Sequence, residues 1–166
     1  PWERRLNVHV QTIGEDSAVR VTSATERDII ACLWSGNDRI VYLQDKGGDE
    51  NYHLFSAKAD GSGARDLTPF DGVRTTIVDP LEEKDDEMLV GLNRRDPTVF
   101  DVYRLNLDSG ELSLVEENPG DIGSWMTDHD GKLRVAVKSD GVNTSLLYRE
   151  REGIPFRTLL TTDFRE

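Results

Sequence analysis

The chain has 166 residues, of which 36% are hydrophobic and 31% are charged, and its formal net charge is −12 at pH 7. Nucleic-acid affinity depends on Lys and Arg that neutralise phosphates, so this acidic balance argues against a nucleic-acid partner and against an anionic membrane surface. No apolar run approaches the roughly 18 residues that span a bilayer, and no segment has the pattern of a signal peptide.

Apolar residues recur at a period of about 46 residues, which is typical of stacked or radial repeats. Three series carry this period: Val8, Leu54, Val102 and Leu147; Val21, Leu67, Leu114 and Leu159; and Ile40, Met88 and Leu133. The third series begins only in the second repeat. The pattern therefore predicts one half-unit followed by three full units, with Leu67, Leu114 and Leu159 in equivalent, largely buried places.

Each unit is predicted to consist of strands joined by tight turns, because apolar and polar residues alternate or β-branched residues cluster. In chain order the predicted strands are 6–12 and 18–22 in the half-unit, 28–34, 39–44, 52–59 and 64–68 in the next unit, and then 100–107 and 132–137. The sequences of 60–63, 108–110 and 130–131 combine Asp with Gly, which favours hairpin turns.

Four antiparallel strands repeated every 40 to 50 residues describe a propeller blade. We predict an all-β fold, a partial β-propeller of about three and a half four-stranded antiparallel blades. Residues 1–166 form one domain fragment, with a half-blade at 1–24 and blades at about 25–70, 71–118 and 119–166. Since the smallest propellers need roughly 184 residues at this period, we expect a piece of a longer protein that self-associates through apolar blade flanks.

No catalytic, cofactor or metal residue is assigned from the sequence. Ser62 lies between two glycines in a predicted hairpin. The geometry of the turn explains these small neighbours better than a role of Ser62 as a catalytic nucleophile does. His9 and His53 lie in predicted strands, where a partly buried imidazole is expected. His129 is the third histidine, and no pair of Cys or His residues in the chain has the spacing of zinc ligands. The segment 128–131 lacks the closing Glu of a calcium loop, so a hairpin is favoured.

Two acidic loops can be interpreted in two ways. Residues 82–87 and 45–51 are interpreted first as solvated loops, and second as carboxylates that capture the positive N-terminus of a substrate. The single cysteine, Cys32, lies in an apolar stretch and is predicted to be a buried small hydrophobe. A chain that cannot form an internal disulfide fits a reducing cytoplasm.

Several segments resemble the N-terminal β-propeller of the prolyl oligopeptidase family, especially its acylaminoacyl-peptidase and dipeptidyl-aminopeptidase branch. The segments are 38–45, 47–55, 65–69, 94–106 and 125–132. The resemblance spans nearly the whole chain but includes none of the family's catalytic motifs. There is no Gly-x-Ser-x-Gly nucleophile elbow, and no strand–helix alternation that would build a hydrolase sheet.

The resemblance implies a division of labour in which a propeller gates and orients short peptides for an α/β-hydrolase domain of the same parent chain. The parent would be a serine peptidase, while this chain alone would have no catalytic residues, cofactor or metal. The alternative is a binding or scaffold propeller that resembles the TolB periplasmic domain and has no enzymatic activity. The sequence downstream of Glu166 would distinguish the two.

Overall fold

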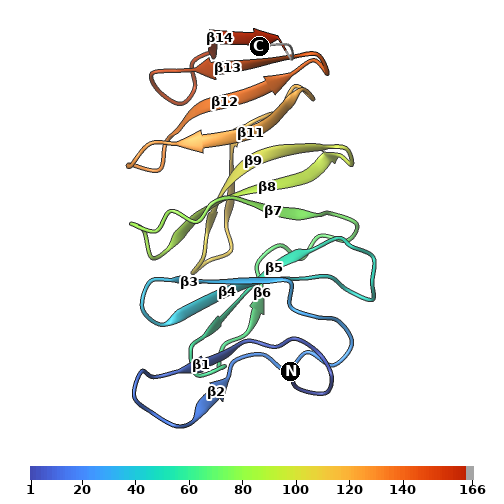
Figure 1. Cartoon of the computed structure of the whole chain (residues 1–166), viewed down its shortest axis with the longest axis vertical. Helices are drawn as coiled ribbons and strands as arrows, with labels where there is room; N and C mark the ends of the chain where they lie inside the picture. The colour runs from blue at the N-terminus through green and yellow to red at the C-terminus, as the bar shows by residue number, and fades with distance from the viewer. Residues whose placement is uncertain (164–166) are drawn as a thin grey trace. The chain divides into compact units, whose positions relative to one another are not determined.

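The computed structural model describes residues 1–163, and within that range the regular structure consists entirely of β-strands (Figure 1). These strands form three four-stranded sheets and one two-stranded sheet, in each of which neighbouring strands follow one another in the chain and pair antiparallel. The chain divides into two compact units. The first contains residues 1–75, 84–86 and 107–110, and the second contains 76–83, 87–106 and the residues from 111 onward.

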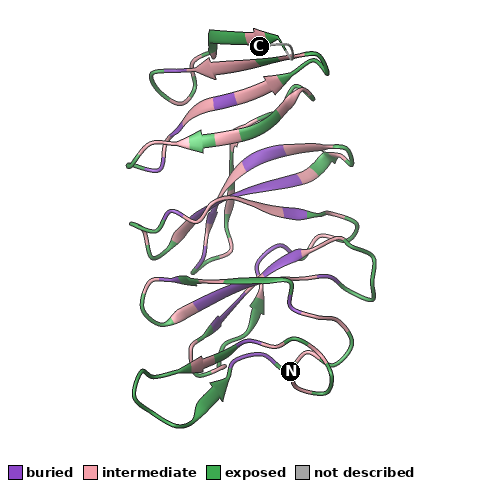
Figure 2. Cartoon of the chain, viewed as in Figure 1, coloured by how far each residue is buried: buried purple, intermediate pink, exposed green. Residues whose placement is uncertain are grey.

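The first unit contains a two-stranded and a four-stranded sheet. Its strands are β1 (His9–Gln11), β2 (Ala18–Arg20), β3 (Ala31–Ser35), β4 (Arg39–Gln44), β5 (His53–Lys58) and β6 (Arg65–Asp66). Figure 2 shows buried residues in the two central strands, β4 and β5, whereas β3 and β6 are largely exposed. One core cluster of this unit comprises Val8, Val21, Ile29, Ile40, Tyr42 and Ala57.

The second unit contains two four-stranded sheets. Thr75, the first residue of β7, is the one residue of these strands that belongs to the first unit. Its strands are β7 (Thr75–Asp79), β8 (Glu87–Asp96), β9 (Val99–Asn106), β10 (Leu112–Glu116), β11 (Ile122–Thr127), β12 (Leu133–Ser139), β13 (Asn143–Tyr148) and β14 (Arg157–Asp163). One core cluster comprises Leu81, Leu89, Val102 and Leu133. The last three residues of the predicted segment 119–166 lie outside the described residues.

The predicted hairpin at 60–63 is confirmed. Gly61 and Gly63 have φ values of +84° and +66°, a conformation that only glycine adopts without strain. The carboxylate of Asp60 accepts a hydrogen bond of 2.8 Å from the Ser62 N–H. Ser62 is therefore a turn residue between β5 and β6.

The prediction that Leu67, Leu114 and Leu159 are equivalent buried residues is wrong. Leu67 is 2% exposed, but Leu114 and Leu159 are 51% and 49% exposed. Bulges cause the difference. In β10 the pairing steps from Leu114 opposite Tyr103 to Glu116 opposite Val102, and in β14 Leu159 has no partner because Leu160 and Thr158 pair with consecutive residues of β13. Since successive side chains of a strand point to opposite faces, one extra residue reverses the orientation expected from spacing.

Cys32 also differs from expectation, because it is exposed rather than buried. It lies in β3, which is an edge strand of its sheet and pairs only with β4. The apolar sequence around Cys32 was consistent with a core strand, but the position of the strand in the sheet decides its exposure.

Candidate functional site

The three histidines lie in different elements. His53, at the start of β5, is 8% exposed, which confirms the expectation of a buried strand histidine. His9 is exposed although it begins β1, because its sheet has only two strands, so the expectation of partial burial is wrong for this residue. His129 lies exposed in the turn after β11. Among residues 1–163, no group of three or more His, Cys, Asp or Glu side chains could hold a metal ion.

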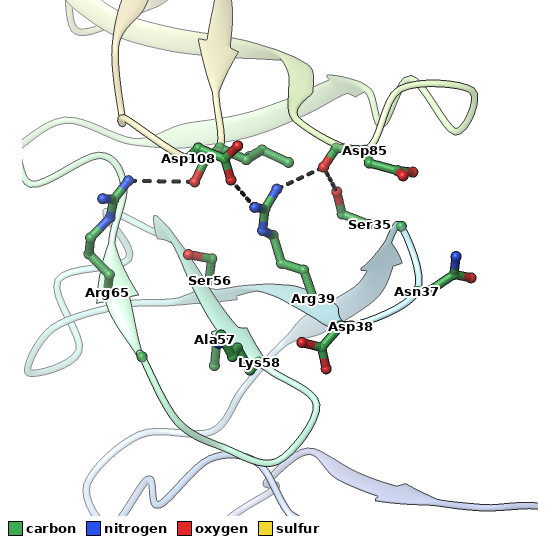
Figure 3. A pocket seen from close by; sticks show the side chains of 13 residues that line it. Ser35, Asn37, Asp38, Arg39, Ser56, Ala57, Lys58, Arg65, Asp85 and Asp108 are labelled. Carbon is green, nitrogen blue, oxygen red and sulfur yellow. Dashed lines mark hydrogen bonds and ion pairs between the residues drawn. The ribbon is translucent and has the colours of Figure 1, made fainter.

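A cavity of about 430 Å³ in the first unit is surrounded by the β3–β4 and β5–β6 hairpins and by residues 84–86 and 107–110 (Figure 3). We call it the Arg39 pocket. Its charged lining residues are the cations Arg39, Lys58 and Arg65 and the anions Asp38, Asp85 and Asp108. Equal numbers of both signs make a polar site that offers donors and acceptors of hydrogen bonds.

Arg39 organises this pocket. Its guanidinium donates a hydrogen bond of 2.7 Å to the carbonyl of Asp85 and forms an ion pair with the carboxylate of Asp108. The same Asp85 carbonyl accepts a 3.1 Å hydrogen bond from the Ser35 hydroxyl (Figure 3). Arg65 reaches the Leu107 carbonyl at 3.5 Å. Arg39 is at the start of β4, just after the turn 36–38, and its charge was not recognised in the sequence as a site feature.

The acidic loop 82–87 has mostly exposed side chains, as the solvated-loop interpretation expects. Glu82, Glu83, Asp85 and Asp86 are all exposed. Asp85 contributes its backbone carbonyl to Arg39 and Ser35, while Glu87 lies 3.3 Å from the Arg104 guanidinium in the second unit. The loop is therefore attached to the Arg39 pocket through its backbone, at the Asp85 carbonyl.

The acidic loop 45–51 is held by its first residue. The Asp45 carboxylate accepts hydrogen bonds of 2.9 Å from Arg27 Nε and 3.3 Å from the Glu50 N–H, and its side chain is 2% exposed. The hydrogen bond from Arg27 outweighs burial and holds the pKa of Asp45 below its usual range. Because both oxygens are occupied, Asp45 fixes the loop and is not free to receive a ligand.

A second cavity of the first unit, of about 370 Å³, lies beside this loop and is lined by His53 and Phe55. We call it the His53 pocket. His53 Nδ1 lies 2.7 Å from Asp66 Oδ2, and the imidazole stacks on the Phe55 ring with centroids 6.3 Å apart. The part-buried pair of His53 and Asp66 was not recognised in the sequence, because the two residues are 13 positions apart and the pairing of β5 with β6 brings them together.

The second unit has an uncharged cavity of about 460 Å³. Phe100 and Trp125 contribute aromatic rings to it, and Gly91, Gly120 and Gly123 leave room for a guest. A methyl group on Gly91 would approach the Thr76 hydroxyl to 2.5 Å, so the close contact of β7 and β8 requires glycine there. An uncharged cavity with aromatic walls suits an apolar side chain.

The segment 128–131 forms the predicted hairpin between β11 and β12. The Asp128 carboxylate accepts hydrogen bonds of 3.0 Å and 2.9 Å from the N–H groups of Asp130 and Lys132, and one of 2.6 Å from Arg134 Nε. Burial alone would raise the pKa of Asp128, but these hydrogen bonds outweigh it and the pKa is lowered. Its oxygens are thus occupied by the protein itself.

The chain is similar to two proteins with curated names. It is 35% identical, over 95% of its length, to dipeptidyl aminopeptidase BIII of Pseudoxanthomonas mexicana, and 27% identical, over 84% of its length, to dipeptidyl peptidase family member 6 of Caenorhabditis elegans. It spans only 24% and 20% of the lengths of these relatives. The expected resemblance to a propeller of the prolyl oligopeptidase family is confirmed. No family model matches the chain.

Among solved structures, TolB from Acinetobacter baumannii matches 94% of this chain and 38% of its own, with a TM-score of 0.59 and 13% identity. A likeness at this identity shows the fold alone. Together with the antiparallel sheets, it confirms the predicted fold class, an all-β partial β-propeller of about three and a half blades. Among residues 1–163, no helix is long and apolar enough to cross a membrane.

Proposed function

We propose that this chain is the propeller part of a dipeptidyl-peptidase-like serine peptidase, in which it gates and orients peptide substrates for a hydrolase domain of the same parent chain. The carrying observation is 35% identity to a dipeptidyl aminopeptidase across 95% of the chain. We further propose that the half-blade 1–24 and the blades 25–70, 71–118 and 119–166 are its repeating units.

The side chains of this chain support binding more than bond cleavage. Ser62 is confined to a turn, and His53 is paired with Asp66 within the sheet. The Arg39 pocket offers polar groups to a peptide backbone, and the uncharged cavity beside Phe100 and Trp125 suits an apolar side chain. A propeller with these features would select peptides by fit, while the reaction takes place on groups supplied by another domain.

The partners follow from the same proposal. They are short peptides and the hydrolase domain of the parent chain, with no role for nucleic acid, consistent with the net charge of −12. The single cysteine, Cys32, is compatible with a cytoplasmic location. The acidic loop 82–87, with its exposed carboxylates, is the better of the two loops for attracting the N-terminus of a substrate.

The second candidate function is a scaffold propeller without enzymatic activity. The structural likeness to TolB, which covers 94% of this chain, is compatible with it at the level of the fold alone. The two functions differ in the reading frame downstream of residue 166. A strand, a Gly-x-Ser-x-Gly segment and a helix would support the peptidase, whereas a stop after further blades would support the scaffold.

The decisive experiment uses the full-length protein encoded by that reading frame. We expect it to release dipeptides from chromogenic dipeptidyl anilides and to be labelled by a serine-reactive phosphonate, and we expect the 166-residue chain alone to show neither property. A full-length protein that folds but has no peptidase activity would contradict the peptidase function. Activity and labelling in the isolated chain would contradict the binding role given to it here.

A variant of the full-length protein tests gating. Replacement of Arg39 by Ala should remove the contacts of its guanidinium with Asp85 and Asp108 and change the ratio of kcat/KM for long and short peptides by roughly tenfold, with little effect on dipeptidyl anilides. Arg151→Ala is the matched control, because Arg151 is exposed and has no side-chain partner among the described residues. Equal length preference in both variants would contradict a gating role for the Arg39 pocket.

A further inference from the structure

The His53 pocket contains a hydrogen-bond acceptor that is accessible from the cavity and that the described residues of the protein do not use. The His53 side chain is only 10% exposed and lines the cavity. Its Nδ1 lies 2.7 Å from Asp66 Oδ2. An ionised carboxylate only accepts hydrogen bonds, so Nδ1 carries a proton, and in the neutral tautomer that this hydrogen bond selects Nε2 has a lone pair. Within residues 1–163, Nε2 has no hydrogen-bond partner.

Asp66 fixes this arrangement. Its Oδ1 accepts a 2.9 Å hydrogen bond from the Thr68 N–H while Oδ2 binds His53, so the carboxylate is held at both oxygens. Thr68 and Thr75 continue the network. The Thr68 hydroxyl accepts hydrogen bonds of 2.8 Å from the Leu54 N–H and 2.9 Å from the Thr75 hydroxyl. Thr68 and Thr75 are buried, so the hydrogen bonds that hold Asp66 and orient the imidazole are anchored in the interior of the unit.

The charges around the pocket favour a cation. Asp45 is neutralised by Arg27, and Asp66 is occupied by His53, but Glu26 and Asp71 line the same cavity as exposed carboxylates without an ion-pair partner among the described residues. Lys46 is the one lining cation, within the described part of the chain, that is not in an ion pair. The unpaired charge of the lining is thus negative, and Phe55 adds an apolar wall to the cavity.

We propose that the His53 pocket binds an organic ammonium group. The ammonium would donate one hydrogen bond to His53 Nε2, interact with the carboxylates of Glu26 and Asp71, and pack its carbon atoms against Phe55. An anion would instead need a protonated imidazole and would face both free carboxylates. The inference does not rest on the proposed function, because binding is measured on this chain without turnover.

The test is a titration of the 166-residue chain with n-butylammonium chloride, followed by two-bond ¹H–¹⁵N correlation spectra of the imidazoles. These spectra distinguish protonated from unprotonated ring nitrogens. We expect an unprotonated Nε2 in free His53, and a saturable shift of this signal with amine while His9 and His129 remain unchanged. Equal shifts of all three histidines, or a saturable shift with sodium acetate in place of the amine, would overturn the proposal.

Variants separate the pocket from the fold. Glu26→Gln with Asp71→Asn changes only exposed, unpaired carboxylates and should weaken binding several-fold, and His53→Phe should weaken it by about tenfold, the typical value of a hydrogen bond to a charged group. His9→Phe is the matched control and should bind like the unmodified chain. Unchanged affinity in the carboxylate double variant, whose fold does not depend on those residues, would overturn the proposal even if His53→Phe failed to fold.

Two further ligands identify the source of the ammonium. Nα-acetyl-lysine methylamide presents a side-chain ammonium, whereas glycine methylamide presents that of a chain terminus. Tighter binding of the lysine derivative would assign the pocket to a lysine of a partner segment, and tighter binding of the glycine derivative would assign it to a peptide N-terminus. Binding of neither compound would overturn the proposal.

Discussion

Single polar residues in or just before β1, β5 and β9 connect parts of each sheet through side-chain hydrogen bonds. Position 7, 46 residues before His53, carries Asn7, whose Oδ1 accepts hydrogen bonds of 2.9 Å from the Thr22 hydroxyl and 2.7 Å from the Ala24 N–H. His53 occupies the equivalent position but donates, through Nδ1, to the Asp66 carboxylate. At the corresponding place in β9, Asp101 accepts a 2.8 Å hydrogen bond from the Asn118 N–H. Three different polar residues at equivalent positions thus link one strand to the next strand or to the residues just after it.

The most buried of these residues gives a test with a defined pH dependence. Asp101 is 1% exposed and also accepts hydrogen bonds of 2.9 Å and 2.7 Å from Arg95. Burial alone would raise the pKa of Asp101, but the hydrogen bonds from Arg95 and Asn118 outweigh it and the pKa is lowered. We expect Asp101→Asn to reduce the free energy of unfolding by about 1–3 kcal/mol at pH 7.

The sign of the pH effect follows from the lowered pKa. The stabilisation from ionised Asp101 is complete above the unfolded-state pKa of about 3.9 and is lost as pH falls through the lower folded-state value. Urea unfolding at a series of pH values should therefore show a constant gap between the two proteins above about pH 4 and a shrinking gap below it. Asp16→Asn, at an exposed position, should stay within about 0.5 kcal/mol of the unmodified chain. A gap that grows on acidification would contradict this assignment.

Strand register decides which residues of each sheet are buried. Leu67 of the first unit donates its N–H to the Leu54 carbonyl at 2.8 Å and faces the core at 2% exposure. Leu114 lies opposite Tyr103, a position that corresponds to Asp66 opposite Phe55 in the sheet of β3–β6. The exposed face is the expected place for such a residue once the bulge in β10 is taken into account.

A pair of truncations tests this register. Leu67→Ala should lower the free energy of unfolding by roughly 2–5 kcal/mol through lost burial and a residual cavity. Leu114→Ala should cost less than about 0.5 kcal/mol because the side chain is half exposed. Denaturant unfolding of both variants checks the expectation, and equal costs would mean that the bulge is misplaced.

The hairpin before β12 provides a second test at this scale. Gly131 has φ of +69°, and an added Cβ would approach Leu81 Cδ2 to 2.8 Å. Gly141 has φ of +89° but has nothing within 4 Å of the same atom. Both Ala substitutions introduce the strain of a left-handed backbone conformation, about 1–2 kcal/mol. Only Gly131→Ala should add a steric cost, so its midpoint of thermal unfolding should be lower than that of Gly141→Ala. Similar midpoints for the two variants would show that Leu81 moves aside without cost.

At the scale of the whole molecule, the sheet of β11–β14 leaves apolar side chains accessible. Cross-strand pairing places Val137, Leu146 and Leu160 on one face, and Leu160 is 56% exposed. Met126 and Val142 of the same sheet and its turn are 45% and 54% exposed. Soluble monomers rarely expose contiguous apolar patches of more than a few hundred Å², so this face is suited to contact another protein surface.

We expect the isolated chain to self-associate at micromolar concentration through this face. Leu160→Lys should raise the dissociation constant measured by sedimentation velocity by about tenfold or more, because it places a charge in the contact. Ser113→Lys adds the same charge at an exposed polar position of β10 and should leave association unchanged. A monomer at all concentrations, or equal effects of both substitutions, would contradict the prediction.

The sequence by itself determined the all-β class, the repeated antiparallel strands and the turn positions, because these depend on local alternation of apolar residues and on Gly and Asp in hairpins. It also determined that the chain has no nucleophile elbow. Only the tertiary structure decided that Leu114 is exposed, that Cys32 lies on an edge strand, and that His53 meets Asp66. Those features depend on which residues lie opposite one another across neighbouring strands, and a single inserted residue changes that pairing without disturbing the local pattern.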